Sequence, residues 1–393
     1  MNSAERAGLR PKGNVPTLRF PEFSGEWKTI RLEDCVFFLD EQRKPVKSSE
    51  RHAKKGIYPY YGASGIIDYV DEYLFDDDLI LLSEDGANII DRNYRISFIS
   101  KGKVWVNNHA HVLKPKPYYS IDFISEFLES LNYSIYNTGT TMPKLNQEVC
   151  RGIKVKVPSL TEQSKIGKML TLMNERIEAQ IRIIEKLQSL MKGITNRIIE
   201  DLISNAESVP FSEIYQMAGE GGTPDTTKTQ YYEEGTIPFI KIDDLSSKYL
   251  TKNKDFITEQ GLQKSSAWII PENSLIYSNG ATIGAASINT YKVATKQGIL
   301  GIVPKSMISV EYLFYLVTST FFDSQVHRII THGTMATAYL KDINNIKVPL
   351  PCMNEQRRIV TGLASLSDKI EIEQGILFNL QKQKRFLLCK LFI

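Results

Sequence analysis

Hydrophobic residues recur at alternating spacings of four and three over two long stretches of the chain, a pattern typical of helices that pair along one seam. The first stretch predicts a helix over residues 159–203 and the second over 352–393. At 1.5 Å per residue, a helix of about 40 residues extends roughly 60 Å, so each is expected to act as a spacer. The apolar seam positions are Ile166, Leu170, Met173, Ile177, Ile184, Leu187, Met191, Ile194 and Ile198, then Ile359, Leu363, Leu366, Ile370, Leu377, Leu380, Leu387 and Leu391.

The two stretches are copies of each other. Residues 153–200 return as residues 346–393 at a constant displacement of 193, and 13 of the 48 paired positions are identical. Two copies at this spacing predict a pseudo-dimer within one chain rather than a solenoid of many units. If a pseudo-twofold axis perpendicular to the helices relates the two halves, the helices pair in antiparallel fashion.

The first seam has one polar position, Gln180, and the second has two, Glu373 and Lys384; Gln180 and Glu373 are mates in the repeat. In an antiparallel pair both lie near the helix midpoints, so we expect them to meet and to fix the register at some cost in stability. The alternative is that both side chains face solvent at the edge of the seam.

The segments before the two helices carry short runs of β-branched and aromatic residues separated by Gly, Asp and Asn turns, which predict strands. A loose tail over 1–14 precedes a mixed α/β domain over 15–158, and a second such domain covers 204–351. The fold class is therefore α+β with a pseudo-twofold internal repeat. Strands are predicted at Ile57–Tyr61, Leu79–Leu82, Ile96–Ile99, Lys103–Val106, Ile237–Ile242, Ser274–Tyr277 and Ile299–Val303, and helices at Ile121–Tyr133 and Val310–Arg328.

Length and composition fit two or three ordinary globular domains. The 393 residues exceed one comfortable core, and 42% hydrophobic with 24% charged residues argues against disorder. A net charge of +3 permits contact with nucleic acid, provided that the basic surface is local. Neither a membrane-spanning run nor a signal peptide is evident, so a cytoplasmic location is expected. The isolated cysteines Cys35, Cys150, Cys352 and Cys389 are expected to be reduced.

Catalytic motifs are not evident. The glycine cluster Gly219–Gly222 lacks the Gly-Lys-Ser/Thr of a phosphate-binding loop, and no amino-methyltransferase tetrapeptide occurs. His109 and His111 could face one side of a strand as metal ligands, but no third ligand is near them. Pro224-Asp225 with Lys228 lacks the second acidic residue of a nuclease core. We therefore expect no catalytic residue and no metal site in this chain.

Several motifs resemble those of one known family, the specificity (S) subunits of type I restriction-modification systems. The exits of both domains resemble it most, each leading into a long helix. The resemblance covers nearly the whole chain from about Val15. Its motifs are VPTLRFPEFSGEW (15–27), YPYYGASGIIDYV (58–70), SEDGANI (83–89), VPSLTEQSKI (157–166), GGTPDTTKTQYYEEGTIPFIKIDDL (221–245), SNGATIGAASI (278–288) and LPCMNEQRRI (350–359).

The resemblance implies two target recognition domains separated by two long conserved helices that form an antiparallel coiled coil. Each domain would read one half of a split, asymmetric sequence in double-stranded DNA. The helices would dock two methyltransferase (M) subunits, which carry S-adenosylmethionine and methylate adenine N6. Restriction (R) subunits with motor and nuclease activity, which use ATP and magnesium, would join the assembly, and no cofactor would bind this chain. The alternatives from the residues alone are a coiled-coil adaptor without DNA binding and a solitary nuclease.

Base reading requires Arg, Lys, Asn, Gln, Ser and Thr side chains on exposed loops. The Thr-rich exits Thr138–Lys144 and Thr331–Lys341 are the preferred segments, because they join domain to helix in both copies. The extra apolar residues Ile181, Ile183, Ile372, Ile376 and Phe378 lie outside the seam and predict a partner-binding face. The candidate DNA-binding residues are Tyr60, Tyr61, Ser64, Asn88, Arg92, Asn93, Arg95, Asn107, Asn108, Thr140, Thr141, Lys144, Lys241, Ser278, Asn279, Thr282, Lys296, Gln297, Thr334, Thr337, Tyr339 and Lys341.

Overall fold

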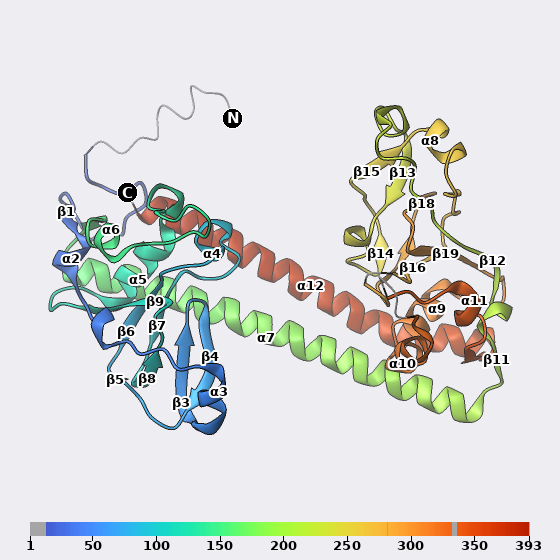
Figure 1. Cartoon of the computed structure of the whole chain (residues 1–393), viewed down its shortest axis with the longest axis horizontal. Helices are drawn as coiled ribbons and strands as arrows, with labels where there is room; N and C mark the ends of the chain where they lie inside the picture. The colour runs from blue at the N-terminus through green and yellow to red at the C-terminus, as the bar shows by residue number, and fades with distance from the viewer. Residues whose placement is uncertain (1–12, 281, 332–335, 393) are drawn as a thin grey trace. The chain divides into compact units, whose positions relative to one another are not determined.

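The computed structural model describes residues 13–280, 282–331 and 336–392. Most of the tail expected over 1–14 therefore lies outside the described residues. The chain divides into two compact units: residues up to Arg182 together with those from Gly375 onward form unit 1, and Ile183–Gln374 forms unit 2 (Figure 1). Each unit contains one α/β domain and one end of each long helix.

Unit 1 is built on two four-stranded sheets, with strand orders β2-β9-β6-β7 and β4-β3-β8-β5, and a two-stranded pair β1-β10, among its described residues. Its elements are β1 (Lys28–Arg31), α2 (Leu32–Cys35), β2 (Val36–Phe38), η1 (Asp40–Gln42), α3 (Ser48–Ala53), β3 (Lys55–Gly62), β4 (Gly65–Val70), β5 (Phe75–Asp76), β6 (Leu79–Ser83), α4 (Asn88–Asp91), β7 (Ser97–Ser100), β8 (Lys103–Val106), β9 (Ala110–Pro115), α5 (Ile121–Ser130), η2 (Tyr133–Ile135), α6 (Gln147–Arg151) and β10 (Lys154–Val157).

Helix α5 joins the first sheet of unit 1 to the long helices (Figure 1). Its buried face contributes Phe123 and Phe127 to a core that also contains Ile166 and Leu170 of α7 (Leu160–Asn205) and Leu391 of α12 (Met353–Leu391). The helix begins at Ser120, whose hydroxyl accepts a hydrogen bond from the amide of Phe123 and so satisfies a donor that the helix itself leaves unpaired. The helix is shorter than the predicted Ile121–Tyr133: it ends at Ser130, because Leu131 takes an extended backbone conformation.

Unit 2 has the same plan within the part of it that is described: a five-stranded sheet of order β12-β19-β16-β17-β14, a three-stranded sheet β15-β13-β18 and a pair β11-β20. Its elements are β11 (Ser208–Pro210), η3 (Phe211–Glu213), β12 (Tyr215–Glu220), η4 (Thr229–Tyr231), β13 (Ile237–Ile240), η5 (Ile242–Asp244), β14 (Tyr249–Leu250), β15 (Asp255–Ile257), α8 (Glu259–Gln263), β16 (Leu275–Ser278), β17 (Ala286–Asn289), β18 (Ala294–Thr295), β19 (Ile299–Pro304), α9 (Val310–Val317), α10 (Thr320–Ile329), α11 (Leu340–Ile343) and β20 (Lys347–Pro349).

The single helix predicted over Val310–Arg328 is wrong, because the structure breaks it into α9 and α10 at Ser319. Ser319 takes an extended backbone conformation, and its hydroxyl accepts from the amide of Phe322 while donating to the carbonyl of Leu316 at 2.6 Å. A serine that bonds the backbone on both sides offers it an alternative to continuous helix. The apolar pattern continues across the break and conceals it.

The two long helices pair in antiparallel fashion within each unit. In unit 1 the start of α7 packs with Leu387 and Leu391 near the end of α12. In unit 2 the end of α7, at Ile199 and Leu202, packs with Ile359 near the start of α12. The predicted fold class, two mixed α/β domains with two long helices and an internal repeat, is confirmed.

The predicted seam is wrong at Ile194, whose side chain is exposed while Thr195 beside it is buried. The apolar contacts move by one position toward the end of α7, where Ile199 and Leu202 are buried. A straight α-helix has about 3.6 residues per turn and drifts away from a strict 3.5-residue repeat. The seam of α7 therefore follows the helix geometry rather than an ideal heptad.

Gln180 and Glu373 are both buried, with exposed fractions of 8% and 7%. Glu373 also pairs with Lys369 one turn away, at 2.6 Å. Their burial argues against the alternative in which both face solvent. Gln180 belongs to unit 1 and Glu373 to unit 2, so their contact and its role in setting the register stay predictions.

A repeated glutamine joins each domain to its helix. Gln163 accepts from the amide of Ser120 at 3.0 Å and donates to the carbonyl of Pro158 at 3.0 Å. Its mate Gln356 accepts from the amide of Ser309 at 2.8 Å and donates to the carbonyl of Pro351 at 2.9 Å. Both glutamines are buried, and both satisfy backbone groups at the start of a domain helix and at a domain exit. We call this arrangement the glutamine joint.

Candidate nucleic-acid interface

Four loops of unit 1 meet where β3, β6 and β8 end and β9 begins. The amide of Asn107 donates to the carbonyl of Tyr61 at 3.1 Å, and the amide of Glu84 donates to the carbonyl of His109 at 2.9 Å. The amide of Leu145 donates to the carbonyl of Glu84 at 2.7 Å. These three bonds tie the loops to one another and leave their outer side chains free to contact a ligand. We call the group loop cluster 1, residues 61–64, 84–87, 107–109 and 138–145.

Unit 2 repeats the same three bonds where β13, β16 and β18 end and β19 begins. The amide of Lys296 donates to the carbonyl of Ile240 at 3.0 Å, and that of Asn279 donates to the carbonyl of Gly298 at 3.1 Å. The amide of Ala338 donates to the carbonyl of Asn279 at 2.9 Å, and Ala338 is the repeat mate of Leu145. Loop cluster 2 therefore comprises residues 240–241, 279–280, 282–284, 295–298 and 336–339.

The structure distributes the candidate DNA-binding residues among three environments. Eleven are exposed: Ser64, Asn93, Asn108, Thr140, Thr141, Lys144, Thr282, Lys296, Gln297, Tyr339 and Lys341. Six are half-buried: Tyr61, Asn88, Arg92, Arg95, Lys241 and Thr337. Four are buried: Tyr60, Asn107, Ser278 and Asn279. Thr334 lies outside the described residues.

Burial matters because a side chain inside the protein has no surface to offer to a base edge. The hydroxyl of Tyr60 instead accepts a hydrogen bond from the amide of Val46 at 2.9 Å, within the protein. Asn107 accepts from the amide of His109 at 2.8 Å and shapes the loop. Most of the exposed candidates, among them Asn108, Thr140 and Lys296, lie in the two loop clusters.

A buried ionic network supports loop cluster 1. His111 of β9 is 1% exposed, its Nδ1 lies 2.6 Å from a carboxylate oxygen of Asp40, and its Nε2 lies 2.8 Å from the carbonyl of Leu145. Both ring nitrogens face acceptors, so both donate and the ring is cationic. Burial alone lowers the pKa of His111, but hydrogen bonds with Asp40 and Cys150 outweigh it and raise the pKa to about 10.

The same network includes Glu84, whose carboxylate lies 3.8 Å from Nδ1 of His111. Glu84 pairs with Arg43 at 2.6 Å and with Lys144 at 3.4 Å. Burial raises the pKa of Asp40, yet the hydrogen bond from His111 outweighs it, so the pKa lies below its ordinary value. Loop cluster 1 is thus supported by two acids and two cations that are mostly out of solvent.

Loop cluster 2 uses a neutral side chain for the same task. Asn279 is fully buried, and its Nδ2 donates to the carbonyl of Ala338 at 3.1 Å. Among the described residues its Oδ1, the hydroxyl of Ser278 and the hydroxyl of Tyr277 have no hydrogen-bond partner. Gly280 lies so close to Gly298 that a Cβ on Gly280 would come within 3.2 Å of the Gly298 Cα. Here close backbone packing replaces the charges of unit 1.

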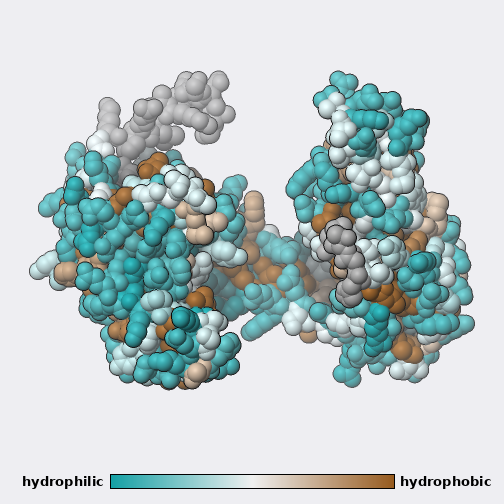
Figure 2. All heavy atoms as spheres, viewed as in Figure 1, coloured by the Kyte–Doolittle hydropathy of each residue, from teal (hydrophilic) through white to brown (hydrophobic). Residues whose placement is uncertain are grey.

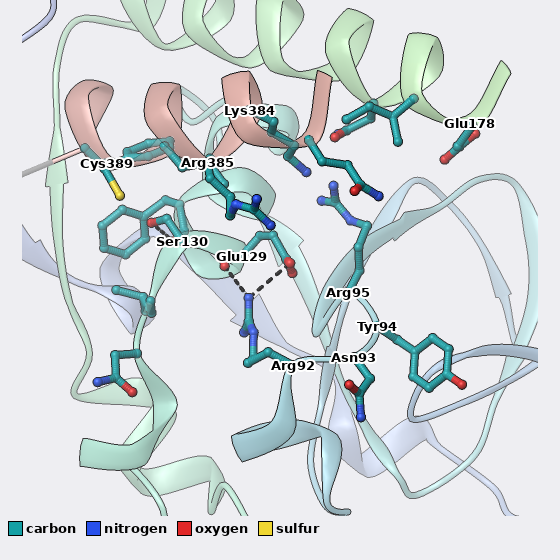
Figure 3. A pocket seen from close by; sticks show the side chains of 18 of the residues that line it. Arg92, Asn93, Tyr94, Arg95, Glu129, Ser130, Glu178, Lys384, Arg385 and Cys389 are labelled. Atoms are coloured by element: carbon teal, nitrogen blue, oxygen red, sulfur yellow. Dashed lines mark hydrogen bonds and ion pairs between the residues drawn. The ribbon is translucent and has the colours of Figure 1, made fainter. Parts of the chain in front are cut away.

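Arg92 and Arg95 do not lie in loop cluster 1 but face the long helices of their own unit (Figure 3). Arg92 pairs with Glu129 at 3.0 Å, and Arg95 pairs with Glu126 at 2.5 Å. Glu126 also lies 3.5 Å from the ammonium of Lys384 on α12. A cavity of about 930 Å³ opens between these side chains and the helices.

Unit 2 has a smaller cavity of about 370 Å³ at the corresponding place. Seven helix positions that line the cavity of unit 1 have repeat mates lining that of unit 2; the mates are Ser367, Ile370, Gln188, Met191, Lys192, Thr195 and Asn196. Tyr315, six residues after the capping Ser309, stands where Glu126 stands after Ser120. Its hydroxyl accepts from Lys248 at 3.1 Å. The two cavities match in position and differ in charge.

The five apolar residues predicted to bind partners are all exposed. Ile181, Ile376 and Phe378 lie in unit 1, whereas Ile183 and Ile372 lie in unit 2. Figure 2 shows hydrophobic surface along the long helices. Exposed apolar residues on a helix that is already paired are typical of a surface that contacts other proteins.

His109 and His111 are possible metal ligands by sequence, although no metal site is expected there; in the structure each has another partner. His109 pairs with Asp85 at 2.9 Å, while His111 belongs to the buried network. Within the ranges that the structure describes, no group of three or more His, Cys, Asp or Glu side chains could hold a metal ion. Nor does any described helix have the length and apolar character needed to cross a bilayer.

The supporting residues Asp40, Arg43 and Glu84 were missed by the sequence analysis. They come from three separate segments, and no spacing rule brings them together. One signal was present: His111 stands in an otherwise apolar strand, Ala110-His111-Val112-Leu113, where a buried histidine requires polar partners.

Comparison with known proteins places this architecture in a family. The family model described as "Type I restriction modification DNA specificity domain" matches residues 24–196 and again residues 203–382. A putative type I restriction enzyme specificity subunit of Haemophilus influenzae is 28% identical over 92% of this chain and 93% of its own length. A type I restriction enzyme specificity subunit of Methanocaldococcus jannaschii is 22% identical over 94% of this chain and 92% of its own length.

A solved structure has the same fold. The S subunit of a type I restriction-modification system from M. genitalium matches with a TM-score of 0.61 at 15% identity, covering 96% of this chain and 99% of that one. The double match of the family model coincides with the two halves of the repeat. The chain therefore belongs to the family of specificity subunits of type I restriction-modification systems.

Proposed function

We propose that this chain binds a bipartite, asymmetric sequence in double-stranded DNA, with loop cluster 1 reading one half and loop cluster 2 the other. One observation carries the proposal: the same three backbone hydrogen bonds hold equivalent loops in both units, while the exposed side chains differ. Cluster 1 offers Asn108, Thr140 and Thr141, whereas cluster 2 offers Lys296 and Gln297. Different readers on one frame select different half-sites.

The chemistry of the loops fits this role. Amide and hydroxyl side chains can exchange hydrogen bonds with base edges in the major groove, and exposed lysines such as Lys144, Lys296 and Lys341 can contact phosphates. The chain has a net charge of only +3, so binding would rely on these local lysines rather than on a general positive field. Sequence-dependent DNA shape would contribute where a partner enzyme flips a base from the duplex.

We further propose that two methyltransferase subunits bind the exposed apolar faces of α7 and α12. Ile181, Ile376 and Phe378 would lie in one such contact, and Ile183 and Ile372 in the other. The partners would carry S-adenosylmethionine and methylate adenine N6, and restriction subunits would add ATP- and magnesium-dependent motor and nuclease activity. This chain would act as their non-catalytic guide in the cytoplasm.

Methylome sequencing tests the proposal. The chain is expressed with its methyltransferase subunit in a host without other adenine methylation, and the modified sites are mapped. A single split motif is expected; its absence, with the complex still assembled, contradicts DNA reading and favours the alternative of a coiled-coil adaptor. Replacing Lys296 and Gln297 by alanine is expected to relax one half of the motif only, and a control Lys264→Ala variant, directly after α8 of the same unit, should leave it intact.

A further inference from the structure

One carbonyl in each unit receives a second hydrogen bond from a buried side chain. The carbonyl of Leu145 accepts from His111 Nε2 at 2.8 Å, and that of its repeat mate Ala338 accepts from Asn279 Nδ2 at 3.1 Å. The two donors do not correspond to each other: His111 lies within β9, while Asn279 follows β16. The same backbone atom is thus held by unrelated residues from different strands.

That coincidence is informative because the fold does not require it. The backbone bond from Leu145 or Ala338 to the preceding loop already exists in both units and fixes the general path of the chain. A side-chain bond to the carbonyl of the same residue adds a second constraint, so the peptide plane can no longer rotate. Because different side chains bond this carbonyl in the two units, the bond was not simply inherited from a common ancestor. We infer that fixing this carbonyl matters for function.

Each held residue lies next to exposed side chains and shortly before a helix, α6 in unit 1 and α11 in unit 2. Before Leu145 come the exposed Thr140, Thr141 and Lys144, and beside Ala338 stands the exposed Tyr339. Leu145 and Ala338 themselves are fully buried. Their fixed peptide planes therefore set the direction from which these exposed side chains leave the protein surface.

We propose that His111 and Asn279 are positioning residues that fix the recognition segments 138–145 and 336–339, and so determine how strictly each half of the DNA target is read. The inference rests on the proposed function. Neither residue touches DNA; each acts through the backbone of its segment. Sub-ångström placement of a reading side chain decides whether a hydrogen bond to a base edge can form, so loss of the anchor is expected to relax discrimination.

Unit 1 allows a matched pair of variants. In His111→Asn, the amide nitrogen can replace Nδ1 and keep the bond to Asp40, but nothing reaches the carbonyl of Leu145. In His111→Gln, the longer side chain can replace Nε2 and keep the bond to Leu145. Both variants are polar and uncharged, so they differ mainly in which hydrogen bond remains. Exposed His52 on α3, outside loop cluster 1, provides the control variant His52→Gln.

Unit 2 is tested by Asn279→Ala, which removes the donor, and by Asn279→Ser, which keeps a shorter one. Asn205, exposed at the end of α7 and bonded only to its own helix at the carbonyl of Asp201, supplies the control Asn205→Ala. All variants are purified as the complex with the methyltransferase subunit. Methylation is measured on a DNA library in which each half of the target is varied separately.

The expected result is selective. His111→Asn should lower discrimination in one half of the target by about tenfold to a hundredfold, and Asn279→Ala should do so in the other half only. His111→Gln should retain most of the discrimination. Loss of overall activity with unchanged discrimination, or equal relaxation in both halves, would overturn the inference, because a purely structural role predicts those outcomes.

Hydrogen exchange followed by mass spectrometry provides a readout that does not depend on DNA. His111→Asn should accelerate amide exchange in peptides covering 138–145, and His111→Gln should not; equal exchange in the two variants contradicts the inference. If the unaltered complex methylates DNA without sequence preference, the proposed function fails, and the exchange result alone then judges whether the anchors position their segments. If His111→Asn does not fold, Asn279→Ala decides in the same way, by its discrimination in the other half of the target and by exchange in peptides covering 336–339.

Discussion

The two units hold equivalent backbone segments with different kinds of side chain, charged in unit 1 and neutral in unit 2. Unit 1 supports its recognition loops with the cation of His111 and fills the space against the long helices with the ion pairs of Glu126. Unit 2 supports its loops with the neutral Asn279, from a different strand end, and has the neutral Tyr315 at the helix position that corresponds to Glu126. The helix position occupied by Lys384 in unit 1 is occupied by its mate Met191 in unit 2. Backbone geometry is thus shared, while the charges that stabilise it are not.

This difference shows which features the architecture requires. The three loop bonds and the glutamine joint occur in both units, so they belong to the frame. Among the described residues, the ionic network around His111 and the ion pairs of Glu126 belong to unit 1, so they are a local means of satisfying buried polar groups. Buried ion pairs contribute little net stability while intact but cost much when one partner is lost. The units should therefore respond unequally to mutation and pH.

The largest expected difference comes from removing the carboxylate of Glu126. Glu126 is buried and bonds Arg95, Asn174 and Lys384, so Glu126→Ala leaves two cations without their counter-charge. We expect unit 1 to lose about 3–5 kcal/mol of unfolding free energy. The matched change in unit 2, Tyr315→Phe, removes one hydrogen bond and should cost about 1 kcal/mol.

Tryptophan fluorescence can follow each unit separately during urea unfolding. Trp27 and Trp105 report on unit 1 and Trp268 on unit 2, so a Trp268→Phe background isolates the signal of unit 1. Equal losses from Glu126→Ala and Tyr315→Phe would show that the ionic cluster is not what distinguishes the units.

The next largest effect is a dependence on alkaline pH that is confined to unit 1. Folding raises the pKa of His111 to about 10, so its protonation stabilises the folded state fully below the ordinary pKa and ceases to do so as pH rises through about 10. Between these limits, unit 1 should lose about 1.4 kcal/mol per pH unit more than the His111→Gln variant.

Urea unfolding of unit 1 at intervals from neutral pH to pH 10 would measure this difference. The depressed pKa of Asp40 has the opposite sign: its stabilising effect is present above the ordinary carboxyl pKa and is lost as pH falls through the lowered value. Parallel pH curves for the wild type and His111→Gln would refute the assignment of a buried cation.

Equal effects are expected where the units are alike. Gln163→Ala and Gln356→Ala each leave a backbone amide, that of Ser120 or Ser309, without its acceptor. Each should lower the stability of its own unit by about 1–3 kcal/mol. Thermal unfolding of both variants checks the symmetry of the joint. A difference of more than about 1 kcal/mol between the two losses would mean that the two glutamines contribute unequally to the stability of their units.

The smallest effect concerns exposed lysines and DNA. Lys296→Ala should weaken binding and lower the salt dependence of affinity by about one ion, as expected for loss of one phosphate contact. Lys144→Ala should have a smaller effect, because Glu84 lies 3.4 Å from its ammonium and already offsets its charge. Fluorescence anisotropy titrations at several salt concentrations would rank the two, and the reverse order would contradict this reading of the interface.

Much of the fold could be predicted because the sequence has a periodic hydrophobic pattern and an internal repeat. The alternating spacing around Ile166 and Leu170 and the repeat at 193 residues gave both long helices and the two-unit plan. The failures were local. The break at Ser319 depends on a hydroxyl that bonds the backbone in both directions, and the exposure of Ile194 depends on helical drift accumulated over many turns.

The candidate site was less predictable for a physical reason. Residue type indicates which side chains can contact a base, but burial decides which ones can reach it. Asn279 has suitable chemistry and lies fully inside the protein, while Arg95 is drawn to Glu126. Such pairings link segments that are far apart in sequence, as in Asp40 with His111. The Thr-rich exits remain the preferred segments, because backbone hydrogen bonds of Leu145 and Ala338 tie them to the loop clusters.

The glutamine joint has a consequence for how such proteins diversify. Gln163 bonds main-chain atoms of Ser120 and Pro158, and Gln356 bonds main-chain atoms of Ser309 and Pro351 and, in addition, of Met307. Because these partners exist whatever the neighbouring side chains are, mutation can alter the loops freely without loosening the attachment of a domain to its helix. New preferences can then arise by drift or recombination in the loops, while the attachment is inherited unchanged.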